Sequence, residues 1–177
     1  MQSSVSHRPF HLYTGRIYFI TGHVVYSSFL MDDVKKKIGQ QVLGKVTREL
    51  GISLYSWVIL KNHYHLLCDF GESGGEGELT FATPNNKSYD KRSTKMARFI
   101  RKFHSITSAE FNRIDATQGR KVWYQYWDYC IRNRADFWWH FNYIVQNPLK
   151  HGLVKTLEEA YHYAYSSNPV WLERFGK

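Results

Sequence analysis

Two apolar segments meet at a short polar break in the first half of the chain, and they restrict the fold more than any other feature. The first is SLYSWVILK, Ser53–Lys61, and the second is HYHLLCDF, His63–Phe70. Both are rich in aromatic and branched residues, and the Lys61-Asn62 pair at the break predicts a tight turn. We therefore expect an antiparallel β-hairpin, which needs further elements to cover its apolar face.

The rest of the chain supplies these elements in a regular order. Strands are expected at 16–25 and 121–131, helices at 32–50, 93–111 and 133–147, and a short helix after Thr156. Pro148 and Gly152 would close the third helix, which leaves Asn147 at its fraying end. The first six elements match the ferredoxin-like split βαβ arrangement, an α+β fold in which helices cover one face of an antiparallel sheet.

The length of 177 residues favours one domain. Its two cysteines, Cys68 and Cys130, lie in apolar segments and are expected to be reduced core residues of a cytoplasmic protein. We divide the chain into a flexible lead-in (1–15), a main domain (16–154) that contains a long glycine-rich loop (71–91), and a C-terminal helix and tail (155–177).

The charge of the chain indicates the kind of partner. Lys and Arg total 24 against 15 acidic residues, which gives a formal net charge of +9. Such an excess on a small domain favours binding to a polyanion. Because the chain has neither a long apolar run nor a signal peptide, we expect nucleic acid and not a membrane.

The second strand of the hairpin contains two histidines two residues apart. Side chains alternate along a strand, so His63 and His65 share one face while Tyr64 and Leu66 belong to the apolar other face. Two imidazoles on one face are close enough to bind one metal ion. By itself this triplet is a weak motif, because histidines on strands are more often structural or surface residues.

A tyrosine on the third predicted helix stands apart from the apolar stripe of that helix. At about 100° per residue, Tyr143 points away from Phe137 and Ile144, and Asn147 follows it one turn later. The simplest alternative is an ordinary exposed tyrosine. Gln146 competes with Asn147 for any role that requires an amide oxygen.

These two motifs together resemble those of the single-tyrosine HUH transposases, in particular the branch associated with repetitive extragenic palindromes (REP). The matching segments are NHYHLL and YWDYCIRNRADFWWHFNYIVQNPLKHGLV, and the resemblance spans most of Arg16–Val154. It implies an HUH-endonuclease fold with a C-terminal catalytic helix. It also implies a metal-dependent enzyme that cleaves and rejoins single-stranded DNA near hairpins.

The resemblance assigns a role to each site residue. His63 and His65 would bind a divalent cation, Mg²⁺ or Mn²⁺, with Asn147 as the third ligand. Tyr143 would attack the DNA and form a 5′-phosphotyrosine intermediate. Independently of the resemblance, His140, one turn before Tyr143, is a candidate for proton transfer. The protein could act as a monomer or a homodimer, and the tyrosine could act on the histidines of its own chain or of a partner.

Basic side chains on two predicted helices are candidates for contact with DNA. They are Lys95, Arg98, Arg101, Lys102, Arg132 and Arg134, with Trp123, Tyr124 and Trp139 as candidates for base stacking. The alternative is that the basic faces are merely solvated and the aromatics belong to the core. Two other functions therefore stay open, a non-catalytic nucleic-acid-binding module and a metal-dependent phosphodiesterase that uses water.

Overall fold

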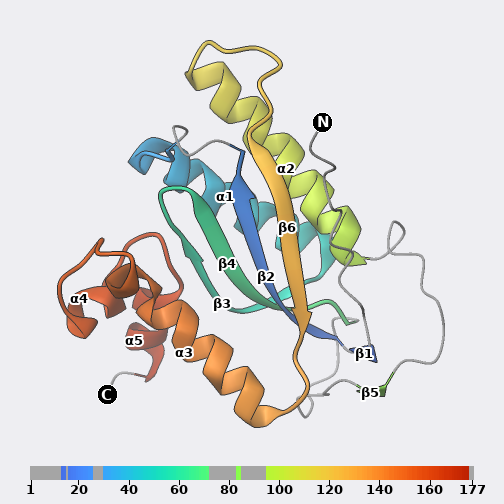
Figure 1. The fold of residues 1–177 in the computed structure, drawn as a ribbon, viewed down its shortest axis with the longest axis vertical. Coiled ribbons are helices and arrows are strands. Elements are labelled where there is room, and N and C mark those ends of the chain that lie inside the picture. Colours follow the sequence, from blue (N-terminus) through green and yellow to red (C-terminus); the bar gives the residue numbers. More distant parts are fainter. Residues whose placement is uncertain (1–12, 15, 26–29, 72–82, 85–94, 176–177) are drawn as a thin grey trace, which may run out of the picture.

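A four-stranded antiparallel sheet forms the centre of the computed structural model, which describes residues 13–14, 16–25, 30–71, 83–84 and 95–175. The strands are β2 (Ile17–Val24), β3 (Ser53–Ile59), β4 (His63–Asp69) and β6 (Trp123–Cys130). They lie in the order β3-β4-β2-β6, with β6 at one edge (Figure 1). This order confirms the predicted ferredoxin-like fold.

The helices cover both faces of this sheet. They are α1 (Asp33–Leu50), α2 (Lys95–Ile114), α3 (Arg134–Lys150), α4 (Leu157–Tyr161) and α5 (Asn168–Phe175). Leu66 of β4 packs in one core cluster with residues of α1 and α2. The next residue, Leu67, packs in a second cluster with Phe137 and Ile144 of α3. The split βαβ unit thus keeps its two helices on one face, and α3 covers the opposite face.

Local signals define the ends of the elements. The Asp32 side chain accepts a hydrogen bond from the Lys35 amide at the start of α1, and Gly51 ends this helix with a φ of 59°. The hairpin turn is closed by the Leu60 amide, which donates to the His63 carbonyl over 2.8 Å. The spacing of Val34 with Val42 and Val46 predicts a shared buried stripe, but Val34, in the first turn of α1, is 58% exposed while the other two are buried.

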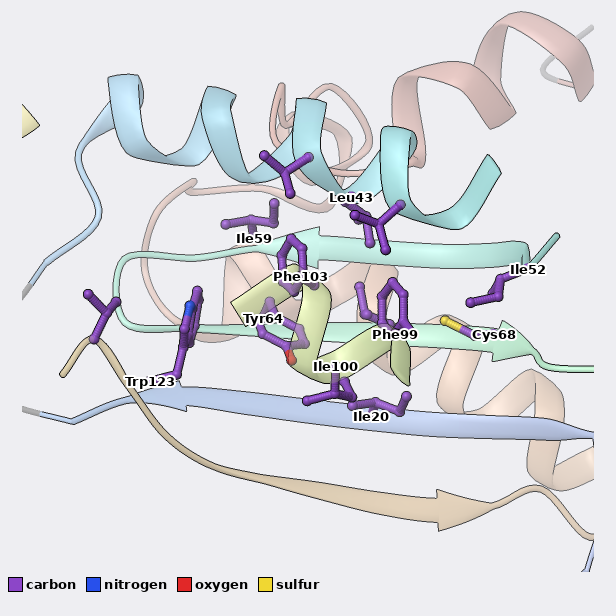
Figure 2. Close-up of a cluster of buried hydrophobic side chains, with 14 of the residues drawn as sticks. Ile20, Leu43, Ile52, Ile59, Tyr64, Cys68, Phe99, Ile100, Phe103 and Trp123 are labelled. Atoms are coloured by element: carbon purple, nitrogen blue, oxygen red, sulfur yellow. The ribbon is translucent and has the colours of Figure 1, made fainter. Parts of the chain in front are cut away.

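The core between the sheet and α1 and α2 is apolar and aromatic (Figure 2). Tyr64 lies at its centre with no exposed surface, and its hydroxyl is 2.7 Å from Nε2 of His104 on α2. The Tyr64 ring passes over Gly22 of β2, where a Cβ atom would come within 2.4 Å of the ring. Glycine is therefore required opposite this tyrosine.

The C-terminal segment connects α3 to the edge of the sheet. The Ile59 amide donates to the Tyr165 carbonyl, and the Ser167 amide donates to the Trp57 carbonyl. Asn168 donates from its side chain to the carbonyls of Val145 in α3 and of Ala160 in α4. These bonds fix the half of α3 that carries the candidate site.

A second sheet of two strands is separate from the main one. Tyr13–Thr14 (β1) pairs with Thr83–Pro84 (β5), a two-residue ladder that the sequence did not indicate. Most of the predicted lead-in and of the predicted long loop lies outside the described residues. Cys68 and Cys130 are free and buried. Within the described part of the chain, no helix has both the length and the apolar character needed to cross a bilayer.

Candidate active site

His63 and His65 lie together on the face of β4 that α3 covers. Their ring centroids are 4.9 Å apart, and their exposed fractions are only 5% and 4%. The sequence correctly placed both histidines on one face. It did not show that a helix would bury them.

Both imidazoles are oriented through their Nδ1 atoms. Nδ1 of His63 lies 2.7 Å from Oδ1 of Asn62, which can only accept, so Nδ1 carries the proton and Nε2 keeps its lone pair. Nδ1 of His65 lies 2.7 Å from the Thr21 hydroxyl on the neighbouring strand. Nε2 of His65 is buried and has no hydrogen-bond partner among the described residues. In metal sites, the partner of one ring nitrogen commonly orients the other towards the ion in this way.

The surroundings keep both rings neutral. The pKa of His63 is lowered to about 4, mainly by burial and then by the nearby His151 and His23, while the Asn147 side chain opposes this shift. Burial, with His63 next in importance, lowers the pKa of His65 to about 2. A neutral imidazole is the form that binds a metal ion, so both rings are ready to act as ligands at neutral pH.

Tyr143 of α3 packs directly against His65, one member of the histidine pair. Its ring centroid is 5.2 Å from that of His65 and 5.9 Å from that of Phe19, both in edge-to-face geometry. Trp139, one turn earlier, stacks on the Tyr143 ring at 5.6 Å with an angle of 13° between the planes. Residues far apart in the sequence therefore meet within one chain.

Asn147 is fully buried one turn after Tyr143. Neither its Oδ1 nor its Nδ2 has a well-formed hydrogen bond among the described residues. We had expected Asn147 at a fraying helix end, and this was wrong. Pro148 is accommodated inside α3, which continues to Lys150, and the His151 amide donates to the Asn147 carbonyl. Gln146, the competing amide, is exposed.

The residues present fit a divalent cation. A buried amide and a buried imidazole nitrogen without partners are costly, and a metal ion would satisfy both. The described residues contain no group of three or more His, Cys, Asp or Glu side chains suited to a metal. An amide oxygen would serve as the third protein ligand, and Asn147, whose buried side chain interacts with His63, is the residue that would supply it.

His140 lies close to the site but is engaged elsewhere. Its Nδ1 is 2.8 Å from the Asp136 carbonyl and 3.2 Å from the carboxylate of the same residue. Its ring is buried between Phe19 and Tyr129. These contacts explain its burial without a role in proton transfer.

The basic residues of α2 are not brought to the site, because α2 covers the other face of the sheet. Lys95 donates to the Gly51 and Gly71 carbonyls, and Lys102 forms an ion pair with Glu49. The remaining two candidates on this helix, Arg98 and Arg101, are exposed. Their role in DNA binding stays a prediction.

The other candidates for DNA contact fall into two groups. Arg132 and Arg134 are exposed at the start of α3, where Arg132 also lies over the Tyr129 ring. Trp123 was a stacking candidate, and this was wrong: it is 5% exposed in the core, and its indole donates to the Thr107 hydroxyl. Tyr124 and Trp139 are exposed, at 58% and 62%.

Sequence reasoning missed Phe19, His23 and His151, whose rings contact the histidine pair, and three further residues that touch the site. Thr21 and Asn62 orient the histidines, and the Nζ atom of Lys150 lies 4.4 Å from the centroid of the Tyr143 ring. Only Asn62 had a signal, since it directly precedes the histidine pair. The contacts of Thr21 and Lys150 arise from strand register and helix rotation.

Comparison with known proteins extends these observations. No protein-family model matches the chain. The chain is 25% identical over 116 residues to the REP-associated tyrosine transposase of Escherichia coli (strain K12), covering 65% of this chain and 55% of that protein. The match thus spans about half the length of the curated relative.

A solved structure is similar over a larger part of the chain. It is that of a REP-associated tyrosine transposase bound to a REP hairpin, with a TM-score of 0.64 and 21% sequence identity. The similarity covers 92% of this chain and 82% of the other, and it supports the fold described above. The chain is therefore similar to a REP-associated tyrosine transposase in sequence and shares the fold of another, in line with the resemblance of its two motifs.

Proposed function

We propose that this protein is a metal-dependent transposase that cleaves and rejoins single-stranded DNA by attack of Tyr143. The observation that carries the proposal is the contact between the Tyr143 and His65 rings, 5.2 Å between centroids. A phenol beside a neutral imidazole of a histidine pair, with a buried amide one turn away, is suited to phosphoryl transfer. Neither alternative function requires this arrangement.

The chain's own residues hold and orient the reacting groups. Tyr143 is fixed between Trp139 and the edge of the His65 ring, which limits the positions that its hydroxyl can take. His63, His65 and Asn147 would hold Mg²⁺ or Mn²⁺; imidazole nitrogen favours Mn²⁺ over Mg²⁺. When bound, the cation would polarise the scissile phosphate.

The reaction keeps the number of phosphoester bonds constant. The Tyr143 phenol loses its proton to water, its oxygen bonds to phosphorus, and the bond from phosphorus to the 3′ oxygen breaks. The products are a 5′-phosphotyrosine and a 3′ hydroxyl that takes up a proton. Because the covalent link preserves the phosphoester, attack by another 3′ hydroxyl rejoins the strands without ATP.

The substrate would be hairpin DNA with a single-stranded flank. The net charge of +9 supports DNA as the partner, and the similar solved protein is bound to a REP hairpin. Since Tyr143 packs on His65 of the same chain, and His65 packs on His63, a monomer would suffice and the tyrosine would act in cis. The cytoplasmic location, the homodimer and the boundaries of the catalytic domain, 16–154, stay predictions.

The test is the covalent adduct. Hairpin oligonucleotides with single-stranded flanks are incubated with the protein and Mn²⁺ or Mg²⁺, and a protein–DNA band that survives denaturation is sought. We expect the band with the natural chain and its loss with Tyr143→Phe or a chelator. Tyr161→Phe, at an exposed tyrosine of α4, is the matched control and should retain the adduct.

The possible failures separate the alternatives. Cleavage without an adduct would indicate a phosphodiesterase that uses water. Binding with no cleavage in any metal would indicate a non-catalytic module. An adduct that persists in Tyr143→Phe would exclude Tyr143 as the nucleophile.

A further inference from the structure

The exposed side of α3 presents three aligned side chains whose chemistry matches that of a nucleotide. Trp139, Tyr143 and Lys150 follow one another at helical spacings of four and seven residues, which places them along one stripe. Trp139 stacks on the Tyr143 ring, and the Lys150 ammonium lies 4.4 Å from the centroid of the same ring. An indole and a cation thus both contact the ring of the candidate nucleophile.

The indole of Trp139 is available to a ligand. It packs against Tyr143 and, edge-on, against His140, yet the residue stays 62% exposed. The indole continues a stack of rings and, among the described residues, has no ring contact beyond Tyr143 and His140, so it offers an exposed flat apolar surface. Unpaired nucleobases bind such surfaces, largely independently of their sequence.

Lys150 supplies the charge that accompanies such a ligand. It is exposed in the last turn of α3, and its ammonium lies beside the ring on which a scissile phosphate would be presented. The charge complements a phosphate. A nucleic-acid strand carries both groups, a base for Trp139 and a phosphate for Lys150.

We infer that Trp139 and Lys150 bind the single-stranded segment at the cleavage point: a base flanking the scissile phosphate stacks on Trp139, and Lys150 contacts the phosphate at Tyr143. This inference rests on the proposed function and names the residues that position its substrate. It predicts that single-stranded DNA contacts this stripe even when cleavage is impossible.

The neighbouring tryptophan provides a matched control. Trp138 is also exposed, at 46%, but it packs on Phe137 and Phe141 and does not contact Tyr143 in the described structure. A general loss of apolar surface would affect Trp138→Ala and Trp139→Ala alike. A specific stacking site would affect only Trp139→Ala.

The binding experiment uses the cleavage-deficient Tyr143→Phe chain, so its result does not depend on catalysis. Fluorescence anisotropy measures the Kd of a ten-nucleotide thymidine strand, and a copy with 5-iododeoxyuridine is photocrosslinked and mapped by mass spectrometry. We expect Trp139→Ala to weaken binding by about tenfold and Trp139→Phe to retain most of the affinity. Trp138→Ala should change the Kd by less than about twofold. The crosslink should fall on Trp139.

A second measurement tests Lys150 in the chain with its tyrosine intact. Lys150→Met should lower the rate of adduct formation at saturating hairpin DNA by about tenfold and reduce the salt dependence of binding by about one phosphate contact. Lys150→Arg should restore both, and Lys155→Met, at an exposed lysine outside the stripe, should leave both unchanged.

The outcomes distinguish the two proposals. Equal effects of Trp138→Ala and Trp139→Ala, or a crosslink away from α3, would overturn the inference while leaving the adduct chemistry intact. If Lys150→Met gave the same rate and salt dependence as Lys155→Met, Lys150 would not contact the phosphate. Absence of any adduct with the natural chain, together with a crosslink on Trp139, would instead refute the proposed function and leave the binding stripe standing.

Discussion

The two faces of β4 are both buried, yet they differ in polarity and in how well their polar atoms are satisfied. On the face towards α1 and α2, Tyr64, Leu66 and Cys68 have no exposed surface, and the one polar group among them, the Tyr64 hydroxyl, is paired with His104. On the face towards α3, His63 and His65 are almost as buried, and Nε2 of His65 has no partner among the described residues. Burial alone therefore does not separate a core from a site.

The difference lies in what each face would lose on mutation. Removing a satisfied aromatic side chain leaves a cavity and an unpaired partner. Removing the His65 imidazole leaves a smaller cavity and removes a buried nitrogen that has no partner, at the cost of the bond to Thr21. Substitutions on the face towards α1 and α2, the core face, should thus lower the stability of the protein. Substitutions on the face towards α3, the site face, should instead impair its function.

The largest effect is expected from Tyr64→Ala. We expect the free energy of unfolding to fall by about 3–5 kcal/mol, because a central aromatic ring is lost and His104 is left unpaired. Urea unfolding followed by circular dichroism measures it. In His65→Ala, at the next residue and on the other face, the free energy of unfolding should fall by about 1 kcal/mol or less. Equal losses at both positions would show that the two faces do not differ in this way.

The next effect concerns metal binding to the site face. Mn²⁺ at about 100 times its Kd should stabilise the natural chain by about 2.7 kcal/mol, provided that it binds only the folded protein. The corresponding rise in Tm should vanish in His65→Ala and Asn147→Ala. Gln146→Ala is the control, since this amide is exposed and should keep the rise. If Mn²⁺ raised the Tm of Asn147→Ala as much as that of the natural chain, the third ligand would be another residue.

The third effect is a dependence of stability on pH. Burial lowers the pKa of His104 to about 3, and His63 and His65 are lowered to about 4 and about 2. As the pH falls below 6.5, the unfolded chain binds protons that the folded chain does not, so stability is full above pH 6.5 and declines towards pH 4.

One substitution on each face divides this decline. His104→Gln and His65→Gln should each reduce the slope of unfolding free energy against pH by about 1 kcal/mol per pH unit between pH 6 and 4. Each removes one of the protons that the unfolded chain binds and the folded chain does not. Urea unfolding at a series of pH values measures the slope. An unchanged slope in His65→Gln would mean that this ring is protonated in the folded protein.

The smallest effect is expected from the basic residues far from the site. Arg98→Gln on α2 should leave the Kd for hairpin DNA within about twofold, because α2 covers the core face. Arg134→Gln, at the start of α3, should weaken binding by about threefold and reduce its salt dependence. Anisotropy at two salt concentrations compares them. A larger loss with Arg98→Gln would show that DNA extends across the α2 face.

The sequence by itself determined the features that depend on neighbouring residues. The hairpin at Lys61-Asn62, the cap at Asp32 and the shared face of His63 and His65 follow from turn chemistry, capping and strand alternation, and the structure has all three. The one-turn spacing of Tyr143 and Asn147 is equally local. Such signals act over a few residues and do not require the rest of the fold.

Tertiary structure decided which of these local features meet. The contact of Tyr143 with His65, the approach of Lys150 to the tyrosine ring and the burial of Trp123 depend on which face each element covers. The same holds for Asn147, which stays helical before Pro148 because the C-terminal segment holds α3 against the sheet. Long-range packing overrides local preference wherever the burial of a surface stabilises the chain more than the preference does.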